Sequence, residues 1–224
     1  MNSDVRQESI PCPKCAASLQ VPVIRVLQPE SPALKQLLNG TLNCPKCTHC
    51  GTVFQVEVEQ LIYKNPELGF ILVQAVLPEE NQMKSLEQEV DCLATEAAYR
   101  ENLERPTVRL VFSREDFLEK IFLQQRGFDD RLVEYAKFQL FQNTGGASLL
   151  PTQHRLLYDF SNSTAEKMQF IVFDRESGKP SAAVHLPMAD FQALVEEFEG
   201  DEHLQQELER IFPGCYVHVD RLYD

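Results

Sequence analysis

The sequence predicts an α+β fold with a small β unit near its N-terminal end, then a helical hairpin, then a small antiparallel sheet with helices. Three observations lead to this prediction. Two pairs of cysteines lie in the first 50 residues, short runs of β-branched residues follow them, and apolar residues later recur at the three- and four-residue spacing of amphipathic helices. A short helical insert between the cysteine pairs completes the expected N-terminal unit.

Composition indicates an ordinary folded protein. The chain has 224 residues, of which 43% are hydrophobic and 25% are charged. No apolar run reaches the roughly 20 residues that span a bilayer, and the first residues lack the apolar stretch of a secretion signal. We therefore expect a cytoplasmic protein with no membrane contact. In that reducing compartment, clustered cysteines are metal ligands or redox groups rather than disulfides.

The net negative charge comes entirely from the later part of the chain. Residues 1–63 carry five acidic and five basic side chains, whereas the remainder carries 29 acidic and 16 basic side chains and accounts for the whole net charge of −13. Nucleic-acid binding draws much of its affinity from Lys and Arg that neutralise phosphates. The composition therefore disfavours DNA or RNA and favours a protein partner for the acidic half.

Two CxxC motifs give the strongest chemical signal. Cys12-Pro-Lys-Cys15 is followed, after an insert, by Cys44-Pro-Lys-Cys47-Thr-His-Cys50. Two residues between cysteines allow one tight turn to present both sulfurs to a tetrahedral ion, and two such turns complete its four ligands. The pattern predicts a zinc-ribbon-like unit around one structural Zn²⁺, although four thiolates also suit iron.

Five cysteines compete for four ligand positions, and an internal repeat distinguishes them. When residues 12–23 are aligned with residues 47–58, both cysteines match and each pair leads into a Gln-Val-x-Val run. Gly51 also follows Cys50, at a position where such turns often need a positive φ angle. Cys44 remains the alternate ligand. The predicted metal ligands are Cys12, Cys15, Cys47 and Cys50.

Two other uses of these cysteines have less support. A thioredoxin-like redox site needs one CxxC at a helix N-terminus beside a βαβ unit, whereas Pro13 and residues 18–23 indicate a turn into a strand. A catalytic zinc site keeps an open position for water and usually mixes histidine or glutamate with cysteine. His49 lies inside the second motif and is interpreted as a turn residue.

The sequence offers no catalytic set elsewhere. Asp129, Asp130 and Asp159 are the acids that an active site in the C-terminal half would use. Helix capping explains the first two more simply, and a strand edge explains the third. We predict no catalytic residue.

The first half of the chain follows strand and helix patterns. Residues 31–40 predict a short helix that Ser31 caps and a glycine ends. Residues 52–58, 60–63 and 70–77 are rich in β-branched and aromatic side chains and predict strands beneath the metal.

The middle of the chain predicts helices. Residues 79–103 form a long helix with its apolar stripe in the core, and after a strand at 108–112 two further helices form a hairpin. Ser113 opens the first of these helices and Asp129 the second. Their charged side chains are expected on a solvated outer face. The apolar stripe of the long helix consists of Met83, Leu86, Val90, Leu93 and Ala97.

The last part of the chain follows a linker at 143–148. Strands are expected at 156–160, 168–173 and 182–186, then two helices, then a final strand at 216–219. These patterns predict a small meander covered by helices.

Three segments follow from these elements. Residues 8–78 form the zinc-ribbon-like core, 79–150 its helical continuation, and 151–224 a C-terminal α+β part.

One family shares this order of motifs. The residues concerned are the first CPKC motif, Leu37-Leu38-Asn39-Gly40, Cys47-Thr-His-Cys50-Gly51, Leu61-Ile62-Tyr63 and Gly127-Phe128-Asp129-Asp130-Arg131. In these residues the chain resembles the CpXC domain family, bacterial and archaeal proteins with paired Cys-Pro-X-Cys motifs. The resemblance runs from about residue 10 to 141 and implies the same four zinc ligands but no defined activity. Here the literal second Cys-Pro-Lys-Cys falls at Cys44 and Cys47.

The sequence thus favours a non-enzymatic protein with a structural four-cysteine zinc site that acts as a protein-protein interaction module. A nucleic-acid-binding zinc ribbon is the first alternative, and a thiol redox protein is the second.

Overall fold

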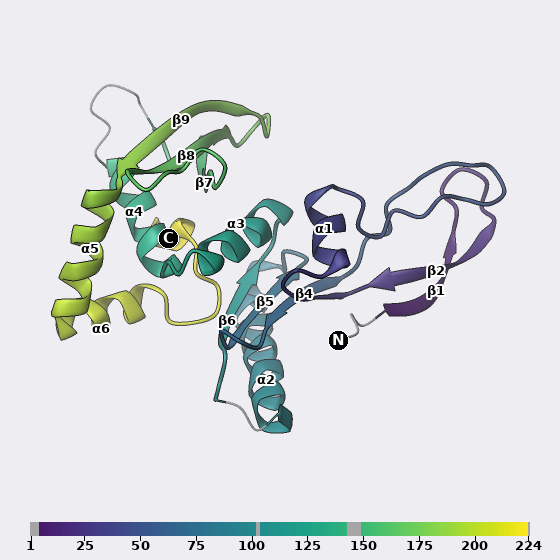
Figure 1. Cartoon of the computed structure of the whole chain (residues 1–224), viewed down its shortest axis with the longest axis horizontal. Coiled ribbons are helices and arrows are strands. Elements are labelled where there is room, and N and C mark those ends of the chain that lie inside the picture. Colours follow the sequence, from purple (N-terminus) through teal and green to yellow (C-terminus); the bar gives the residue numbers. More distant parts are fainter. Residues whose placement is uncertain (1–4, 102–103, 143–148, 224) are drawn as a thin grey trace. The chain divides into compact units, whose positions relative to one another are not determined.

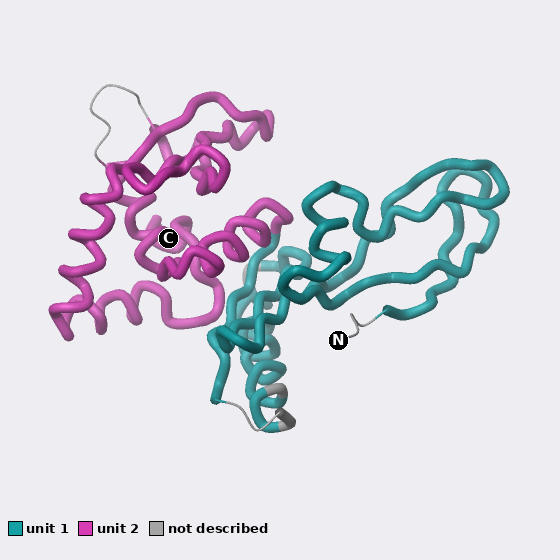
Figure 2. Tube along the Cα trace, in the orientation of Figure 1, with its two compact units in different colours: residues 1–112 teal, residues 113–224 magenta. Residues whose placement is uncertain are grey.

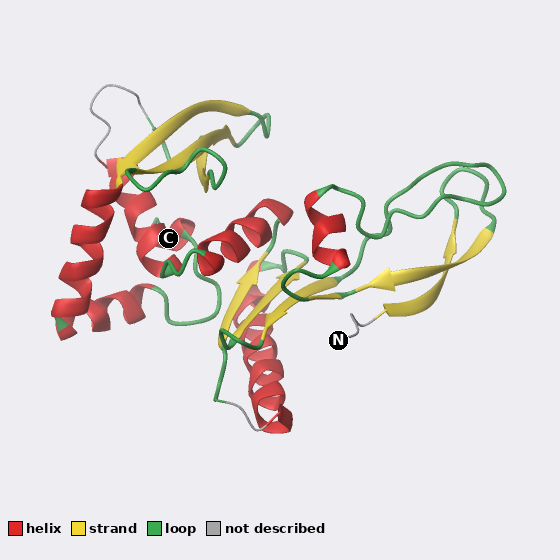
Figure 3. Cartoon of the chain, viewed as in Figure 1, coloured by secondary structure: helices red, strands yellow, loops and turns green. Residues whose placement is uncertain are grey.

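A computed structural model describes residues 5–101, 104–142 and 149–223. The chain divides into two compact units, Met1–Phe112 and Ser113–Asp224 (Figure 2). Both units combine strands with helices, as Figure 3 shows, so the predicted α+β class is confirmed. The finer division into three segments stays a prediction.

The first unit begins with a two-stranded ribbon. β1 (Val5–Pro11) pairs antiparallel with β2 (Ser18–Ile24), and Figure 1 shows this ribbon leading into the loops that carry the cysteines. Sequence patterns did not predict β1. Alternate residues of β2 are buried, because successive side chains of a strand point to opposite faces. These buried residues are Leu19, Val21 and Val23.

A four-stranded sheet in the order β3-β4-β5-β6 forms the framework of the first unit. β4 (Gln60–Asn65) and β5 (Phe70–Ala75) make an antiparallel hairpin. β3 (Val26–Leu27) and β6 (Thr107–Val111) pair parallel to its two strands at the two edges. The strands expected after residue 60 in this unit are therefore confirmed.

The short helix between the cysteine pairs is also confirmed. It is α1 (Pro32–Leu38), and Ser31 caps it, since its side-chain oxygen accepts a hydrogen bond from the Leu34 amide at 3.1 Å. Gly40 follows the helix with a φ of 67°, a conformation that glycine adopts without steric cost.

The long helix of the first unit is α2 (Met83–Glu101), which follows a 3₁₀ turn, η1 (Glu80–Gln82). Val90 and Ala94 are buried one turn apart. Leu93 was predicted to be in the buried stripe, but its side chain is 42% exposed. The buried face passes through Ala94 instead, so the predicted stripe is wrong at this position.

The predicted strand at 52–58 is wrong. Within this segment the structure has only an isolated bridge between Lys46 and Val53. The Val56 amide donates to Asn43 O at 2.9 Å. Lys46 and Asn43 lie just before the second cysteine pair, so these contacts close the loop around that pair, and the segment adds no strand to the ribbon.

The second unit places helices against a three-stranded antiparallel sheet in the order β7-β8-β9. The predicted helical hairpin, meander and later helices are confirmed. A shared apolar core includes side chains from the helices, the sheet and the C-terminal segment. The elements are α3 (Arg114–Gln125), α4 (Asp130–Gln142), β7 (His154–Tyr158), β8 (Lys167–Asp174), β9 (Pro180–Pro187), α5 (Met188–Gly200), α6 (Glu202–Ile211) and η2 (Val219–Leu222).

The predicted strand at 216–219 is also wrong. The chain enters the 3₁₀ turn η2 there, and His218 Nδ1 accepts a hydrogen bond from the Asp220 amide at 3.2 Å. The Val219 amide donates to Glu134 Oε2 at 3.0 Å. A buried carboxylate on α4 therefore takes the hydrogen bond that a neighbouring strand would otherwise accept.

Parts of three predictions lie outside what the structure describes. They are the helix end at 103, the side chain of Ala97 and the linker at 143–148. Among the described helices, none is both long and apolar enough to cross a membrane.

Candidate metal centre

The two cysteine pairs fold into two knuckles with the same hydrogen bonds. In the first knuckle, residues 12–17, the Cys12 amide donates to Ala17 O and the Ala16 amide donates to Cys12 O, both at 2.9 Å. The second knuckle, residues 47–52, repeats both bonds at the equivalent positions, at 2.8 and 2.9 Å. The internal repeat seen in the sequence is therefore a repeat of local backbone structure.

Each knuckle contains one left-handed residue at the same place. Ala16 has a φ of 57° and Gly51 has a φ of 74°. For a residue with a Cβ, this conformation costs roughly 1–2 kcal/mol. The turn therefore requires left-handed backbone at both positions. Gly51 in the second knuckle adopts this conformation without that cost, whereas Ala16 in the first does not.

The four predicted ligands are brought together at this point. The ligand atoms of the four cysteines all lie within 4.8 Å of one another. Cys12 Sγ lies 3.7 Å from Cys50 Sγ, and Cys15 Sγ lies 3.7 Å from Cys47 Sγ, so each short distance joins the two knuckles. A tetrahedral zinc with Zn–S bonds of about 2.3 Å separates its sulfurs by about 3.8 Å. The sulfur spacing therefore fits one such ion. This set is called the four-cysteine cluster below: Cys12, Cys15, Cys47 and Cys50.

The apolar core around this cluster is small. Cys12 and Cys47 are each only 2% exposed, whereas the other two cysteines lie at the surface. A core of this size supplies little stability of its own, as in other small units that depend on a metal or on disulfides. Its buried members are Cys12, Leu19, Val21, Val23, Cys47 and Val56.

Local hydrogen bonds lower the pKa of two of these thiols. The amide of Cys15 lowers the pKa of Cys12, and the Thr52 hydroxyl and amide lower the pKa of Cys50 to about 6. The Ala17 amide acts in the same direction on Cys15, but partial desolvation and the neighbouring sulfurs raise the pKa of this surface thiol to about 12. Several thiolates this close repel one another, and a bound cation removes that repulsion.

Cys44 is not part of the four-cysteine cluster. Cys44 Sγ lies 3.5 Å from Leu42 O and 3.6 Å from Gly40 O, so its thiol contacts backbone carbonyls just before the second knuckle. Among the described residues, the cluster brings together four cysteines and leaves Cys44 out. The identity of the ligands stays a prediction that metal analysis must test.

His49 lies at the exposed tip of the second knuckle and is not part of the cluster. The cluster offers four sulfurs, the number that closes a tetrahedral site, and structural zinc sites are closed in this way, whereas catalytic ones leave a position for water. The donor set therefore fits a metal that holds the fold together.

Comparison with known proteins shows the family to which the chain belongs. A family model described as CpXC protein matches residues 10–137, more than half of the chain. The chain belongs to the CpXC family. The match runs from residue 10, near the end of β1, through both knuckles and the following part of the first unit to a point within α4. Searches of curated proteins and of solved structures returned no match.

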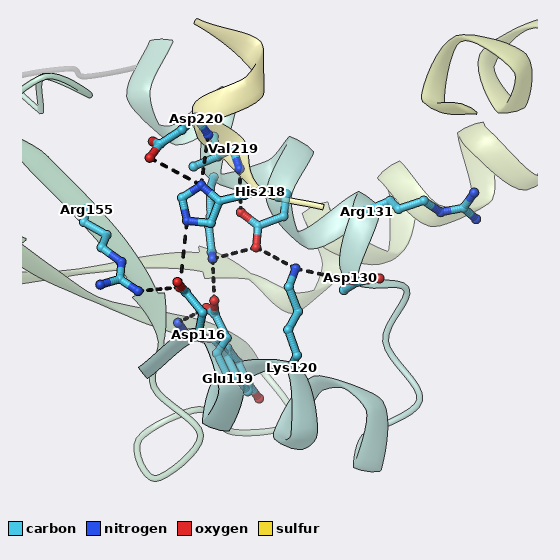
Figure 4. A network of polar contacts seen from close by, with 12 residues as sticks. Asp116, Glu119, Lys120, Asp130, Arg131, Arg155, His218, Val219 and Asp220 are labelled. Atoms are coloured by element: carbon cyan, nitrogen blue, oxygen red, sulfur yellow. Dashed lines mark hydrogen bonds and ion pairs between the residues drawn. The ribbon is translucent and has the colours of Figure 1, made fainter. Parts of the chain in front are cut away.

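The second unit of this CpXC protein contains a buried charge network (Figure 4). Lys137 Nζ lies 2.8 Å from Glu119 Oε2 and 3.0 Å from Glu134 Oε1. Lys120 Nζ lies 3.0 Å from the same Glu134 oxygen and 2.9 Å from Asp130 Oδ2. The predicted solvated outer face for the charges of α3 and α4 is therefore wrong for these five residues, each of which is buried.

A second part of the network joins the sheet and the C-terminal segment. Arg155 of β7 contacts Asp116 and donates to Ser113 Oγ at 2.7 Å. His218 Nε2 lies 3.8 Å from the same aspartate, and Figure 4 shows its ring between Asp116 and Asp220. Together with the Glu134 contact to the Val219 amide, these interactions tie α3, α4, β7 and η2 into one unit.

Electrostatics keep Glu134 ionised despite its burial. Burial alone would raise its pKa, but Lys120 and Lys137 lower it to about 2. Burial alone would lower the pKa of Lys137, but the carboxylates of Glu119 and Glu134 raise it. The ions of this network therefore depend on one another, since a buried charge without a partner is strongly unfavourable.

The three acids considered for an active site each have a local structural contact. Asp129 binds Arg131 at 2.7 Å, and Asp130 binds Lys120. Asp159 is buried and accepts hydrogen bonds from the Asn162 side chain at 2.7 Å and from two backbone amides. These contacts give each of the three carboxylates a structural role.

Sequence reasoning missed this network, although one signal was present. Lys137 lies four residues after Val133 and four before Phe141, and both of these are buried in the core. A lysine on the apolar face of a helix is rarely buried without a partner. That position could have indicated a buried ion pair, but it gave no sign of which acid was the partner.

Proposed function

We propose that this CpXC protein is a non-catalytic protein in which a structural zinc ion stabilises the first unit, while the acidic surface of the second unit binds another protein. The observation that carries the first part is the spacing of the four sulfurs. Two distances of 3.7 Å, from Cys12 Sγ to Cys50 Sγ and from Cys15 Sγ to Cys47 Sγ, join the two knuckles. A closed set of four thiolates supports a structural ion rather than a catalytic one.

Zinc is the metal we propose, with Cys12, Cys15, Cys47 and Cys50 as its ligands. The small core around the cysteines supports this role, because metal binding adds directly to folding free energy where a core is too small to fold alone. Four thiolates also bind iron, so metal analysis must include both ions. We also propose a cytosolic location, since thiolates stay reduced there.

Charge supports a protein partner at the second unit. Residues 113–224 carry 20 acidic and 11 basic side chains. The buried network shields both signs of charge, but acids still outnumber bases among the remaining side chains, so the accessible surface is dominated by acids. The shielded residues are the bases Lys120, Lys137 and Arg155 and their partners Asp116, Glu119, Asp130 and Glu134. Such a surface repels phosphate backbones and attracts basic protein surfaces.

Metal content combined with thiol counting tests the zinc site. Protein is purified without added metal as the native chain, as Cys50→Ser and as the matched control Cys44→Ser. We expect one zinc per chain in the native protein and in the control, and loss of zinc together with knuckle structure in Cys50→Ser. Absence of metal with a reversible disulfide would instead favour a thiol redox protein.

Affinity capture followed by reconstitution tests the partner. The metal-loaded chain is used as bait in native lysate at low and high salt, and each captured protein is then purified and titrated back. A specific partner should bind more weakly as salt rises, because surface charge attraction is screened. Repeated failure to recover any protein that binds again when purified would contradict the proposed function.

A further inference from the structure

The second unit contains a groove that the proposed metal site does not use. It has a volume of about 660 Å³ and lies among the start of α4, α5 and α6, three elements seen together in Figure 1. All of its lining belongs to the second unit, so its shape depends on that unit alone. A hollow of this size accommodates several side chains of a ligand.

Apolar side chains form the floor of this groove. Phe191 and Leu208 are 2% and 3% exposed and are part of the core, while Val195 is half-buried at the surface of the floor. The half-buried side chains of Phe128 and Val195 therefore supply the accessible apolar surface of the floor, and the buried ones support it from the core, which suits a partner with an apolar face. Its apolar members are Phe128, Leu132, Met188, Phe191, Val195, Phe198 and Leu208.

Acidic side chains form the rim. Glu196 and Glu199 lie on α5 and Glu209 on α6, and all three are exposed. Arg131, the basic residue of the lining, is held by Asp129 in an ion pair of 2.7 Å. The rim therefore has a surplus of negative charge on both helices.

The net negative charge of α5 and α6 is larger than that of the rest of the second unit. The segment from the start of α5 to the end of α6 carries eight acidic residues and one arginine. Phosphate-bearing ligands are repelled by such a surface, whereas lysine and arginine are attracted. An apolar floor between two acidic helices fits a ligand that is apolar on one face and basic at its edges.

We propose that this groove binds a basic amphipathic segment of the partner protein, with apolar side chains on the floor and Lys or Arg at the rim. This inference rests on the proposed function and specifies which surface of the second unit carries it. Long basic side chains suit the arrangement, because their aliphatic stems cover apolar surface while their charged ends reach the acids. An amphipathic helix lying in an apolar groove is a common form of protein recognition.

Binding of a designed peptide tests the proposal on the full, metal-loaded chain. The probe is a fluorescent peptide of Lys-Leu-Leu-Lys repeats, and the control probe has every lysine replaced by glutamate. Fluorescence anisotropy measures affinity for the native chain and for variants of the groove. Circular dichroism of each variant verifies that the helices remain folded.

Two groove variants are paired with matched controls on the same helices. Val195→Lys places a cation on the floor, and its control is Ala193→Lys, an exposed position of α5 outside the groove. The second variant combines Glu196→Gln with Glu209→Gln. Its control combines Glu197→Gln with Glu202→Gln, which removes the same charge from exposed positions away from the lining.

We expect the native chain to bind the lysine probe, and Val195→Lys to weaken binding by roughly tenfold. The rim variant should weaken it several-fold, and both controls should bind like the native chain. The proposal is overturned if the native chain does not bind the lysine probe, if the glutamate probe binds equally, or if the controls lose as much affinity as the groove variants.

The captured partner separates this inference from the proposed function. A purified partner that binds Val195→Lys as tightly as the native chain contradicts the groove and leaves the proposed function intact. Failure of the native chain to bind any partner contradicts the proposed function itself, whatever the peptide does.

Discussion

Cys12 Sγ and Cys50 Sγ lie 3.7 Å apart, although the two residues are 38 positions apart in the chain. The other short contact, between Cys15 and Cys47, also crosses from one knuckle to the other. Neither knuckle can therefore complete a tetrahedral site alone. An ion bound here links two distant segments, and closing so long a loop reduces the entropy of the unfolded chain.

The left-handed residue of each knuckle gives a prediction about stability. Ala16→Gly should stabilise the first knuckle, and Gly51→Ala should destabilise the second, each by roughly 1 kcal/mol, because φ is positive at both positions. A Cβ at Gly51 would come no closer than 3.9 Å to Lys46 Cε, so sterics with neighbours add little. The free energy of unfolding measured with urea checks both signs. A loss of stability in Ala16→Gly would contradict the account.

Removal of the metal should affect the two units differently. The core around the cysteines is small, whereas the second unit has a large apolar core of its own. We expect a chelator to abolish hydrogen-exchange protection of the knuckle amides of Cys12 and Cys47, while amides in α4 stay protected. Exchange read by mass spectrometry checks this, with the untreated protein as control. Equal loss in both units would show that the metal stabilises more than the first unit.

Breaking the buried charge network should be costly. Lys137→Met leaves Glu119 and Glu134 short of a buried partner, and loss of one member of such a pair typically costs roughly 3–5 kcal/mol. Glu197→Gln, at an exposed position of α5, is the control and should change stability by at most about 0.5 kcal/mol. Thermal and urea unfolding compare the two variants. Similar stability in both would contradict the assigned role of the network.

Acid should destabilise the second unit through Glu134. Its pKa is lowered from an ordinary 4.5 to about 2, so its ionised form contributes stability above pH 4.5 that is lost as pH falls toward 2. Tyrosine fluorescence during acid titration reports mainly on this unit, which contains four of the six tyrosines. In Glu134→Gln the stability at neutral pH should fall and the dependence between pH 4.5 and 2 should flatten. An unchanged acid profile in that variant would assign the acid sensitivity to other groups.

The knuckles were predictable because their structure is local. The bonds of the first knuckle join residues 12, 16 and 17, and the same spacing recurs from Cys47, so the sequence repeat carried the information. The capped helix after Ser31 was predictable for the same reason. Both depend on residues a few positions apart.

The charge network was not predictable because its partners are distant. Lys137 pairs with Glu119 of another helix, and the Val219 amide pairs with Glu134, 85 residues earlier. Strand propensity at 216–219 was real but was overridden by that carboxylate. The helix periodicity of α3 and α4 showed where apolar side chains lie but not which charges meet among them.

Zinc-edge X-ray absorption on protein purified without added metal tests the central claim most directly. The account predicts one zinc per chain with four sulfur neighbours at about 2.3 Å and no nitrogen or oxygen neighbour. A mixed sulfur and nitrogen shell, or the absence of bound metal, would contradict a closed four-cysteine site.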